Sequence, residues 1–261
     1  MKNYETLKKE WLAEEQQGFK GWDFAHLDGR WEEQELPWRY EDWVKKYLKP
    51  EHKLLDMGTG GGEVLLSFDH PYFNTSVTEA WEPNVKLCKK RLKPLGICVK
   101  QIFDVNTLPF EDNTFDIVLN RHEGYEITEL KRVLKPGGLF ITQQVGGKNN
   151  AELSEFFIND FKSLYEGYDL TSQISQFKAN GFEILYENEC FPYLRFFDIG
   201  AVAFFARVIE WEFPGFSVEG CFEKLCLLHD KIVKEGFVES KVHRFVIVAH
   251  NNKLKLEKVL S

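Results

Sequence analysis

One stretch constrains the fold of this chain more than any other: a short apolar run leads into a glycine-rich loop. It reads Leu-Leu-Asp-Met-Gly-Thr-Gly-Gly-Gly-Glu at positions 54–63 and continues into Val-Leu-Leu. A buried strand, a tight loop and a helix start in this order are typical of a nucleotide-type binding loop. Glycine suits such a loop because it adopts positive φ at little cost and lets a ligand approach the backbone.

The amino-acid sequence of this loop favours one class of ligand over another. Gly58, Gly60 and Gly62 form a G-x-G-x-G pattern, but Glu63 stands where a dinucleotide-binding fingerprint has its third glycine. A carboxylate there would repel a pyrophosphate, whereas Asp56, at the end of the strand, suits a ligand that carries an ammonium group. S-adenosylmethionine (SAM) has an amino-acid end and a sulfonium and no phosphate. The loop therefore favours SAM over a dinucleotide.

Composition limits the class of protein. The chain has 261 residues, of which 43% are hydrophobic and 28% charged, enough for one large α/β domain with a small accessory region. Its net charge of −8 offers little to a phosphate backbone, so a nucleic-acid partner is not expected. The five cysteines are odd in number and contain no C-x-x-C pair, which is typical of reduced thiols in a cytosolic protein.

Neither a signal peptide nor a membrane span is expected. The N-terminus leads directly into a charged segment. The longest apolar run, Ile199–Ile209, is broken by Arg207 and is too short to cross a bilayer. We therefore expect a cytoplasmic protein.

Strands and helices alternate along the chain. Beyond the strand before Gly58, runs rich in β-branched and aromatic residues predict strands at about 75–79, 97–103, 115–120, 139–145, 182–191 and 243–250. Between them, apolar residues at helical spacing predict helices, as at Val85, Cys88 and Leu92. This alternation predicts a parallel, doubly wound α/β sheet that binds its ligand at the carboxyl ends of the strands.

Acidic residues end the first three predicted strands. Glu79 lies 21 residues beyond Gly58, a spacing that suits an acid at the tip of the second strand, binding the two ribose hydroxyls of an adenosyl ligand. Asp104 follows the third strand as Asp56 ends the first. Because the carboxyl ends of parallel strands meet at one edge, we expect these three carboxylates to line a common site.

Five segments in order resemble the class I SAM-dependent methyltransferases, most closely the small-molecule branch that includes quinone-biosynthesis-type enzymes. They are the loop segment 54–63, Val-Thr-Glu at 77–79, Phe-Asp-Val at 103–105 with Leu-Pro-Phe at 108–110, Phe-Asp-Ile-Val at 115–118, and Leu-Lys-Arg-Val-Leu-Lys-Pro-Gly-Gly at 130–138. The resemblance covers residues 50 to about 146. It implies a mostly parallel seven-stranded sheet whose last strand is antiparallel.

The resemblance also implies roles for individual residues. Gly58, Thr59 and Gly60 would lie beside the methionine part of SAM. Glu79 would bind the ribose. The remaining members of the implied SAM-binding set are Asp56, Gly62, Ala80, Asp104 with the Val105 N–H on the adenine, and Asn120 beside the methyl donor. Thr78 stands where the family often has glycine, a mild departure.

The chemistry of the acceptor depends on the segment after the fourth strand, Asn-Arg-His-Glu-Gly-Tyr at 120–125. It lacks the Pro-Pro-aromatic motif of enzymes that methylate exocyclic base amines and the cysteine of enzymes that methylate pyrimidine C5. His122 suits removal of a proton from a hydroxyl or amine, or it is a polar loop residue; much methyl transfer needs only proximity. We predict O- or N-methylation of a small aromatic or apolar acceptor. No metal is expected, because no His, Cys and Asp cluster has ligand spacing.

Two aromatic segments flank the predicted core. The chain is expected to consist of an N-terminal extension at 1–50, containing five of the seven tryptophans, and a SAM-binding domain at 51–261 with a partly helical insert at about 191–240. The extension is either a lid over the ligand or a cover for the core. The rings of the insert, such as Phe196, either wall an acceptor pocket or form a packed layer.

Three classes of function therefore stay open. The first is the small-molecule methyltransferase. The second is an RNA or protein methyltransferase, which a basic surface stripe would favour. The third is a non-catalytic SAM-binding protein or a nicotinamide-binding Rossmann protein.

Overall fold

The computed structural model describes residues 4–19 and 23–252, and the chain forms two compact units. We call the described residues within 37–145, 168–189 and 245–252 the sheet unit, and those within 4–36, 146–167 and 190–244 the accessory unit. The accessory unit thus combines the N-terminal segment with the insert, and adds residues 146–167. The helix α2 (Tyr40–Tyr47) belongs to the sheet unit, so the N-terminal boundary falls at residue 36 where 50 was expected.

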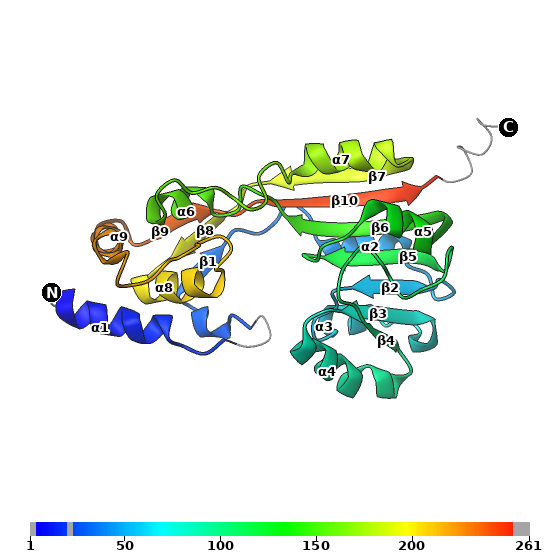
Figure 1. The fold of residues 1–261 in the computed structure, drawn as a ribbon, viewed down its shortest axis with the longest axis horizontal. Coiled ribbons are helices and arrows are strands. Elements are labelled where there is room, and N and C mark those ends of the chain that lie inside the picture. The colour runs from blue at the N-terminus through cyan, green and yellow to red at the C-terminus, as the bar shows by residue number, and fades with distance from the viewer. Residues whose placement is uncertain (1–3, 20–22, 253–261) are drawn as a thin grey trace. The chain divides into compact units, whose positions relative to one another are not determined.

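The sheet unit contains a seven-stranded sheet in the order β4-β3-β2-β5-β6-β10-β7 (Figure 1). Its strands are β2 (Leu54–Met57), β3 (Thr75–Glu79), β4 (Cys98–Gln101), β5 (Phe115–Arg121), β6 (Leu134–Val145), β7 (Phe182–Cys190) and β10 (Arg244–Asn251). Its other helices are α3 (Glu63–Leu66), η2 (Tyr72–Asn74), α4 (Glu82–Arg91), η3 (Lys93–Leu95), α5 (Ile127–Val133) and α7 (Leu170–Ala179).

The strands β4, β3, β2, β5 and β6 pair in parallel. The strand β10 runs antiparallel to β6. The Asn251 amide at the end of β10 donates to the Leu134 carbonyl at the start of β6, at 3.2 Å, so the end of one strand lies beside the start of the other. The arrows of β6 and β10 accordingly point in opposite directions in Figure 1. The predicted fold class, a mostly parallel seven-stranded sheet with an antiparallel last strand, is confirmed.

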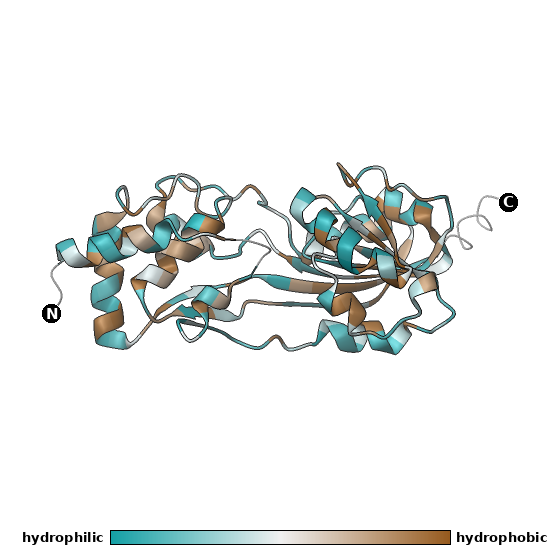
Figure 2. Ribbon diagram, turned by 90° about the horizontal axis from the view of Figure 1, so that it is seen from below, coloured by the Kyte–Doolittle hydropathy of each residue, from teal (hydrophilic) through white to brown (hydrophobic). Residues whose placement is uncertain are grey.

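Helices cover both faces of this sheet. Ile127, Leu130 and Val133 of α5 and Phe177 of α7 pack with Phe140 on one face. On the other face, α2, α3 and α4 pack against a second set of strand residues, including Val77, Leu119 and Ile141. Hydrophobic residues accordingly concentrate along the central strands in Figure 2. Such two-sided burial explains why these strands read as nearly continuous apolar runs.

The strand β6 begins five residues earlier than predicted. The strand was predicted at 139–145, but α5 ends at Val133 and the strand already begins at Leu134. Pairing shifts here, since Phe115 lies opposite Leu134 and Ile117 opposite Leu139. The extra residues form an irregularity of the kind that glycine permits, and Gly137 has φ of +82°.

The accessory unit has its own small sheet and core. A three-stranded antiparallel sheet is ordered β1-β8-β9. Its elements are α1 (Tyr4–Glu15), η1 (Ala25–Leu27), β1 (Trp31–Glu33), α6 (Ala151–Phe157), β8 (Tyr193–Phe196), α8 (Ile199–Val208), α9 (Phe222–Glu235) and β9 (Val238–Lys241). Among the described helices of the two units, none is long and apolar enough to cross a membrane.

Most rings of the insert are buried in this accessory core. Phe196, Phe204 and Phe213 are each at most 1% exposed and pack in one cluster with α1 and α9. Of the two alternatives for the insert, the packed layer therefore holds for these rings, and a pocket wall formed by Phe196 does not. Trp22, one of the tryptophans of the N-terminal extension, lies outside the described residues.

Candidate functional site

The glycine loop is held against the end of β3. The N–H groups of Gly58 and Thr59 both donate to the Thr78 carbonyl, at 3.0 and 3.3 Å. Gly58, Gly60 and Gly62 all have positive φ, between +61° and +79°. The alternating glycines are therefore required by the path of the loop, as the sequence indicated.

Glu79 at the end of β3 reaches back to this loop. Its carboxylate accepts the N–H of Gly60 at 2.9 Å and the N–H groups of Ala80 and Trp81 at 3.0 and 3.2 Å. The side chain is buried, and the Asn84 amide lies 3.4 Å from the same oxygen that accepts from Gly60. Glu79 thus lies at the tip of the second strand of the motif, where its spacing from Gly58 placed it, with its charge stabilised by backbone donors.

Two further carboxyl groups lie around the loop. Asp56 is the third residue of β2, and burial raises its pKa to about 6. Glu123, which follows β5, lies directly over Gly58: a Cβ added to that glycine would lie 2.6 Å from the Glu123 side chain. Burial raises the pKa of Glu123 as well, and the charge of Glu79 acts in the same direction. Carboxyl groups with raised pKa values in one place mark a candidate functional site.

Asp104 lies three residues past the end of β4, in an exposed turn. Its carboxylate accepts the N–H groups of Asn106 and Thr107, at 2.9 and 3.2 Å. The neighbouring Val105 side chain approaches the backbone at Gly124, 3.5 Å from where a Cβ there would lie. The turn after β4 is therefore next to the segment after β5, which carries Glu123.

Asn120 is fully buried at the end of β5. Its side-chain oxygen accepts from the Gln144 amide at 2.6 Å and from the Thr142 hydroxyl at 3.2 Å. The Gln144 amide also donates to the Glu123 carbonyl at 3.1 Å. These bonds connect the ends of β5 and β6 and hold the segment that follows β5.

His122 is exposed and has the left-handed backbone conformation, with φ of +63°. Its N–H donates to the Gln143 carbonyl at 2.9 Å, and its Nε2 lies 3.1 Å from the Gln143 amide nitrogen. Uncommon backbone conformations in non-glycine residues concentrate at functional sites. The residue predicted to be catalytic is therefore held by a specific partner on β6.

The structure brings together most of the residues named from the sequence. The glycine loop, Glu79 and Asp56 lie at the carboxyl ends of β2 and β3, and Asn120 and His122 at the end of β5. Sequence reasoning missed Glu123 and Gln143 as site residues. The signals available in the sequence were His122, adjacent to Glu123, and the polar pair Gln143-Gln144 just before the last residue of the otherwise apolar end of β6.

The residues at this edge fit SAM. The three carboxyl groups of Asp56, Glu79 and Glu123 suit its ammonium and sulfonium charges and would repel a pyrophosphate. Apart from Gly60 and its two chain neighbours, no residue has an atom within 4 Å of where a Cβ on Gly60 would stand, so the middle of the loop is open to a ligand. Among the described residues, no group of three His, Cys, Asp or Glu side chains could hold a metal ion.

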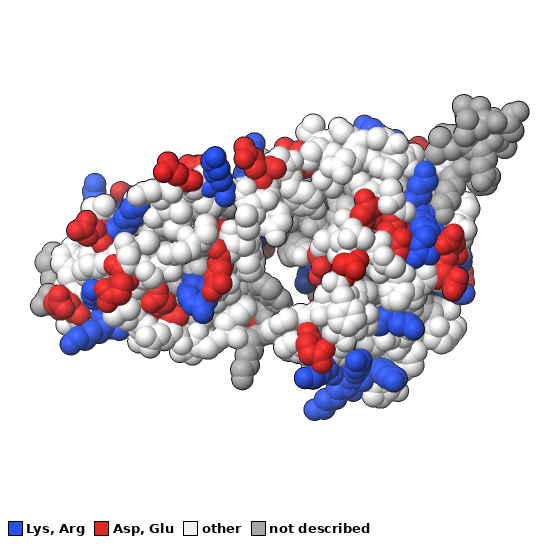
Figure 3. Space-filling view, in the orientation of Figure 1, with Lys and Arg blue, Asp and Glu red and all other residues white. Residues whose placement is uncertain are grey.

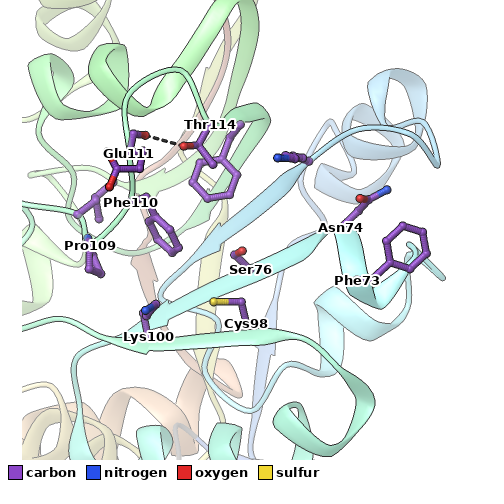
Figure 4. Close-up of a pocket in the computed structure, with 12 residues that line it drawn as sticks. Phe73, Asn74, Ser76, Cys98, Lys100, Pro109, Phe110, Glu111 and Thr114 are labelled. Atoms are coloured by element: carbon purple, nitrogen blue, oxygen red, sulfur yellow. Dashed lines mark hydrogen bonds between the residues drawn. The ribbon is translucent and has the colours of Figure 1, made fainter.

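A groove of about 600 Å³ lies elsewhere on the sheet unit (Figure 4). Lys53, Asn74 and Cys98, which line it, lie at or just before the amino ends of β2, β3 and β4. In doubly wound folds the ligand binds at the opposite, carboxyl edge of the sheet. The groove is therefore separate from the candidate site.

Comparison with known proteins agrees with this geometry. A family model described as a methyltransferase domain matches residues 55–142. An uncharacterized protein of Methanocaldococcus jannaschii is 31% identical over 180 residues, which cover 66% of this chain and 73% of that protein. The ubiquinone/menaquinone biosynthesis C-methyltransferase UbiE of Cupriavidus pinatubonensis is 28% identical over 112 residues, 39% of this chain and 46% of its own length. This chain thus spans less than half of that enzyme.

Solved structures share the fold. A Bacillus halodurans protein assigned as a candidate methyltransferase superposes with a TM-score of 0.54 at 18% identity, covering 81% of this chain and 98% of that one. The YcgJ protein of Bacillus subtilis gives a TM-score of 0.53, also at 18% identity, covering 82% and 98%. With the sheet order and the matched domain, these findings show that the chain belongs to the class I SAM-dependent methyltransferases. It is a methyltransferase enzyme, and members of this family generally use SAM.

Proposed function

We propose that the protein transfers the methyl group of SAM to a small aromatic or apolar acceptor, at an oxygen or nitrogen atom. The observation that carries the proposal is the bond between the Gly60 N–H and the Glu79 carboxylate, which connects the loop and the second strand tip of the family motif. When bound, SAM supplies an electrophilic methyl group and its own leaving group. The protein has to bind both molecules, align them and exclude water.

We assign separate roles in binding SAM and the acceptor to individual residues of the sheet unit. In the proposal, Gly58, Thr59, Gly60 and Gly62 line the methionine part of SAM, and Asp56 and Glu123 balance its positive charges. Glu79, with Ala80 beside it, holds the ribose. Asp104 and the Val105 N–H hold the adenine, Asn120 lies beside the methyl donor, and His122 contacts the acceptor.

Methylation at carbon is the second candidate. It is favoured by the similarity to a relative whose name describes a C-methyltransferase of quinone biosynthesis. An oxygen or nitrogen acceptor attacks the methyl group with a lone pair, whereas a carbon acceptor must be activated by its own ring. The position of the new methyl group in the product distinguishes the two.

The distribution of surface charge bears on the kind of acceptor, and the state of the cysteines bears on the cellular compartment. On the face that Figure 3 shows, basic side chains of the described residues lie among acidic ones, apart from a basic group in the region of α4. The last turn of α4 carries Lys89, Lys90 and Arg91. This distribution supports a small-molecule acceptor over RNA.

None of the five cysteines, all within the described residues, forms a disulfide. That supports our placement of the protein in the cytoplasm.

The proposal is tested by measuring SAM consumption against a library of aromatic metabolites, with product mass and NMR for each active compound. We expect turnover with one group of related compounds, each gaining one methyl group. Binding of SAM without turnover on any acceptor would instead indicate a SAM-binding protein without catalysis. Methylation of bulk RNA would favour the macromolecular alternative.

A further inference from the structure

A chain of two hydrogen bonds runs from a buried indole to the exposed ring of His122. The Trp38 Nε1–H donates to the Gln143 side-chain oxygen at 2.9 Å, and both side chains are buried. The Gln143 amide nitrogen lies 3.1 Å from His122 Nε2. All three residues lie in the sheet unit.

The chemistry of the indole determines the orientation of the amide. An indole nitrogen can only donate a hydrogen bond, so it must face an acceptor. The oxygen of Gln143 therefore faces Trp38, and its NH₂ group faces His122.

The orientation of the amide in turn determines where the imidazole carries its proton. An NH₂ group donates to His122 Nε2, so this nitrogen presents a lone pair and the neutral ring is protonated at Nδ1. The backbone adds a second constraint, because the His122 N–H is bound to the carbonyl of the same glutamine. Ring and backbone are thus both positioned by Gln143.

We propose that Trp38 and Gln143 are positioning residues that hold His122 as the Nδ1–H tautomer, so that the ring meets the methyl acceptor as a hydrogen-bond donor. The Nε2 lone pair is engaged by Gln143, so His122 could remove a proton there only after that bond broke. Donation from Nδ1 selects acceptors with an oxygen or nitrogen lone pair near the methylated atom. The part of this proposal that concerns the acceptor rests on the proposed function, whereas the tautomer does not.

The tautomer is measured by two-bond ¹H–¹⁵N correlation NMR of the full chain labelled with [¹⁵N]histidine, at a pH where the imidazole is neutral. The His122→Asn variant identifies the His122 signals among those of the seven histidines. We expect a protonated, pyrrole-type Nδ1 and an unprotonated, pyridine-type Nε2. A predominantly Nε2–H tautomer, the form that free imidazole side chains favour in water, would overturn the proposal.

Two variants test the positioning residues separately. In Gln143→Glu the side chain keeps its size but its carboxylate accepts, so Nε2 is expected to become protonated. In Trp38→Phe the donor is lost and the amide can turn over, so a mixture of both tautomers is expected. Trp43→Phe is the matched control, because this ring on α2 stacks on Tyr186 and its change should leave His122 as in the wild type.

Melting curves and SAM titrations on the same samples separate the possible failures. An unchanged His122 spectrum in folded Gln143→Glu would overturn the role of Gln143, and in folded Trp38→Phe the role of Trp38. If Gln143→Glu fails to fold, the wild-type tautomer and Trp38→Phe decide the question. Absence of SAM binding to a wild type with the Nδ1–H tautomer would contradict the proposed function and leave the tautomer assignment intact.

Discussion

The backbone N–H of Gly60 donates a 2.9 Å hydrogen bond to the carboxylate of Glu79, which lies 19 residues further along the chain. This bond joins the middle of the glycine loop to the tip of the neighbouring strand. Both oxygens of this carboxylate already accept from the protein, so ligand hydroxyls would share or replace its weakest contact, the one with the Asn84 amide at 3.4 Å. Glu79 is therefore expected to act both on the shape of the loop and on ligand affinity.

Replacing Glu79 with alanine should weaken SAM binding by about 1.5–3 kcal/mol, roughly 10- to 150-fold in dissociation constant, because a charged acceptor of two ribose hydrogen bonds is lost. Calorimetric titration measures the change, and a melting curve shows whether the variant is folded. Glu82→Gln, at an exposed acid three residues on, is the control and should bind SAM as the wild type does. An unchanged dissociation constant in Glu79→Ala would show that Glu79 is not the ribose ligand.

Gly58→Ala and Gly60→Ala form a matched pair. Both glycines have φ of just over +60°, so alanine at either position should cost about 1–2 kcal/mol of stability for the conformation alone. Gly58→Ala should cost more, since its Cβ would overlap Glu123, whereas nothing lies near the Cβ position of Gly60. Urea unfolding measures both. In a Glu123→Gly background, which removes both the Cβ and the Cγ that the new methyl group would meet at 2.6 Å, the extra cost should disappear. Equal costs of the two substitutions with Glu123 in place would contradict the contact.

Asp56 should make stability and SAM affinity respond to pH in opposite directions. Burial raises its pKa from 3.8 to about 6, so the folded state favours the neutral carboxyl. The stability that this group contributes is complete below about pH 4 and is lost as the pH rises through about 6. SAM affinity should rise over the same interval, because the ionised form attracts an ammonium group.

The variant Asp56→Asn isolates this effect, since an amide stays neutral. The difference in unfolding free energy between wild type and variant should change between about pH 4 and pH 7, and at higher pH the variant should gain relative to the wild type. Its SAM affinity should be lower and should rise less with pH than that of the wild type, because Glu123, whose pKa burial also raises, still ionises. A pH-independent difference between the two proteins would contradict the raised pKa.

Phe196→Ala should destabilise the accessory unit by roughly 3–5 kcal/mol, because the ring is fully buried in that unit's core. Phe197→Ala is the neighbouring control: this ring is 38% exposed, and its loss should cost only about 0.5 kcal/mol. Chemical denaturation of both variants provides the comparison. A stable Phe196→Ala variant that has lost acceptor turnover would restore the pocket interpretation.

The sheet unit was predictable from the sequence because its signals are local. Gly58, Glu79 and the apolar runs each indicate the strand or loop in which they lie. A parallel sheet then brings the carboxyl ends of these strands to one edge. The accessory unit was harder to predict, because its strands β1, β8 and β9 have three or four residues each and pair across distant segments. Burial of Phe196 likewise depends on packing with partners far along the chain, which ring content alone does not reveal.

The residues of the candidate site likewise fall into those that the sequence could place and those that only the structure reveals. Asp56, Glu79 and Asn120 could be placed from the sequence because each lies at or next to the last residue of a predicted strand. Glu123 and Gln143 act through contacts with Gly58 and His122 that no spacing rule describes. The bond between Trp38 and Gln143 joins residues 105 positions apart in the chain, so only the structure could reveal it.

The most direct test of the central claim is a calorimetric titration of the full chain with SAM, with its demethylated product and with NAD. We predict one site that binds SAM or the demethylated product at micromolar concentration, on the order of −8 kcal/mol, and no heat with NAD. Clear binding of NAD together with no heat from either SAM or its product would contradict the assignment of the glycine loop and the three carboxyl groups to SAM.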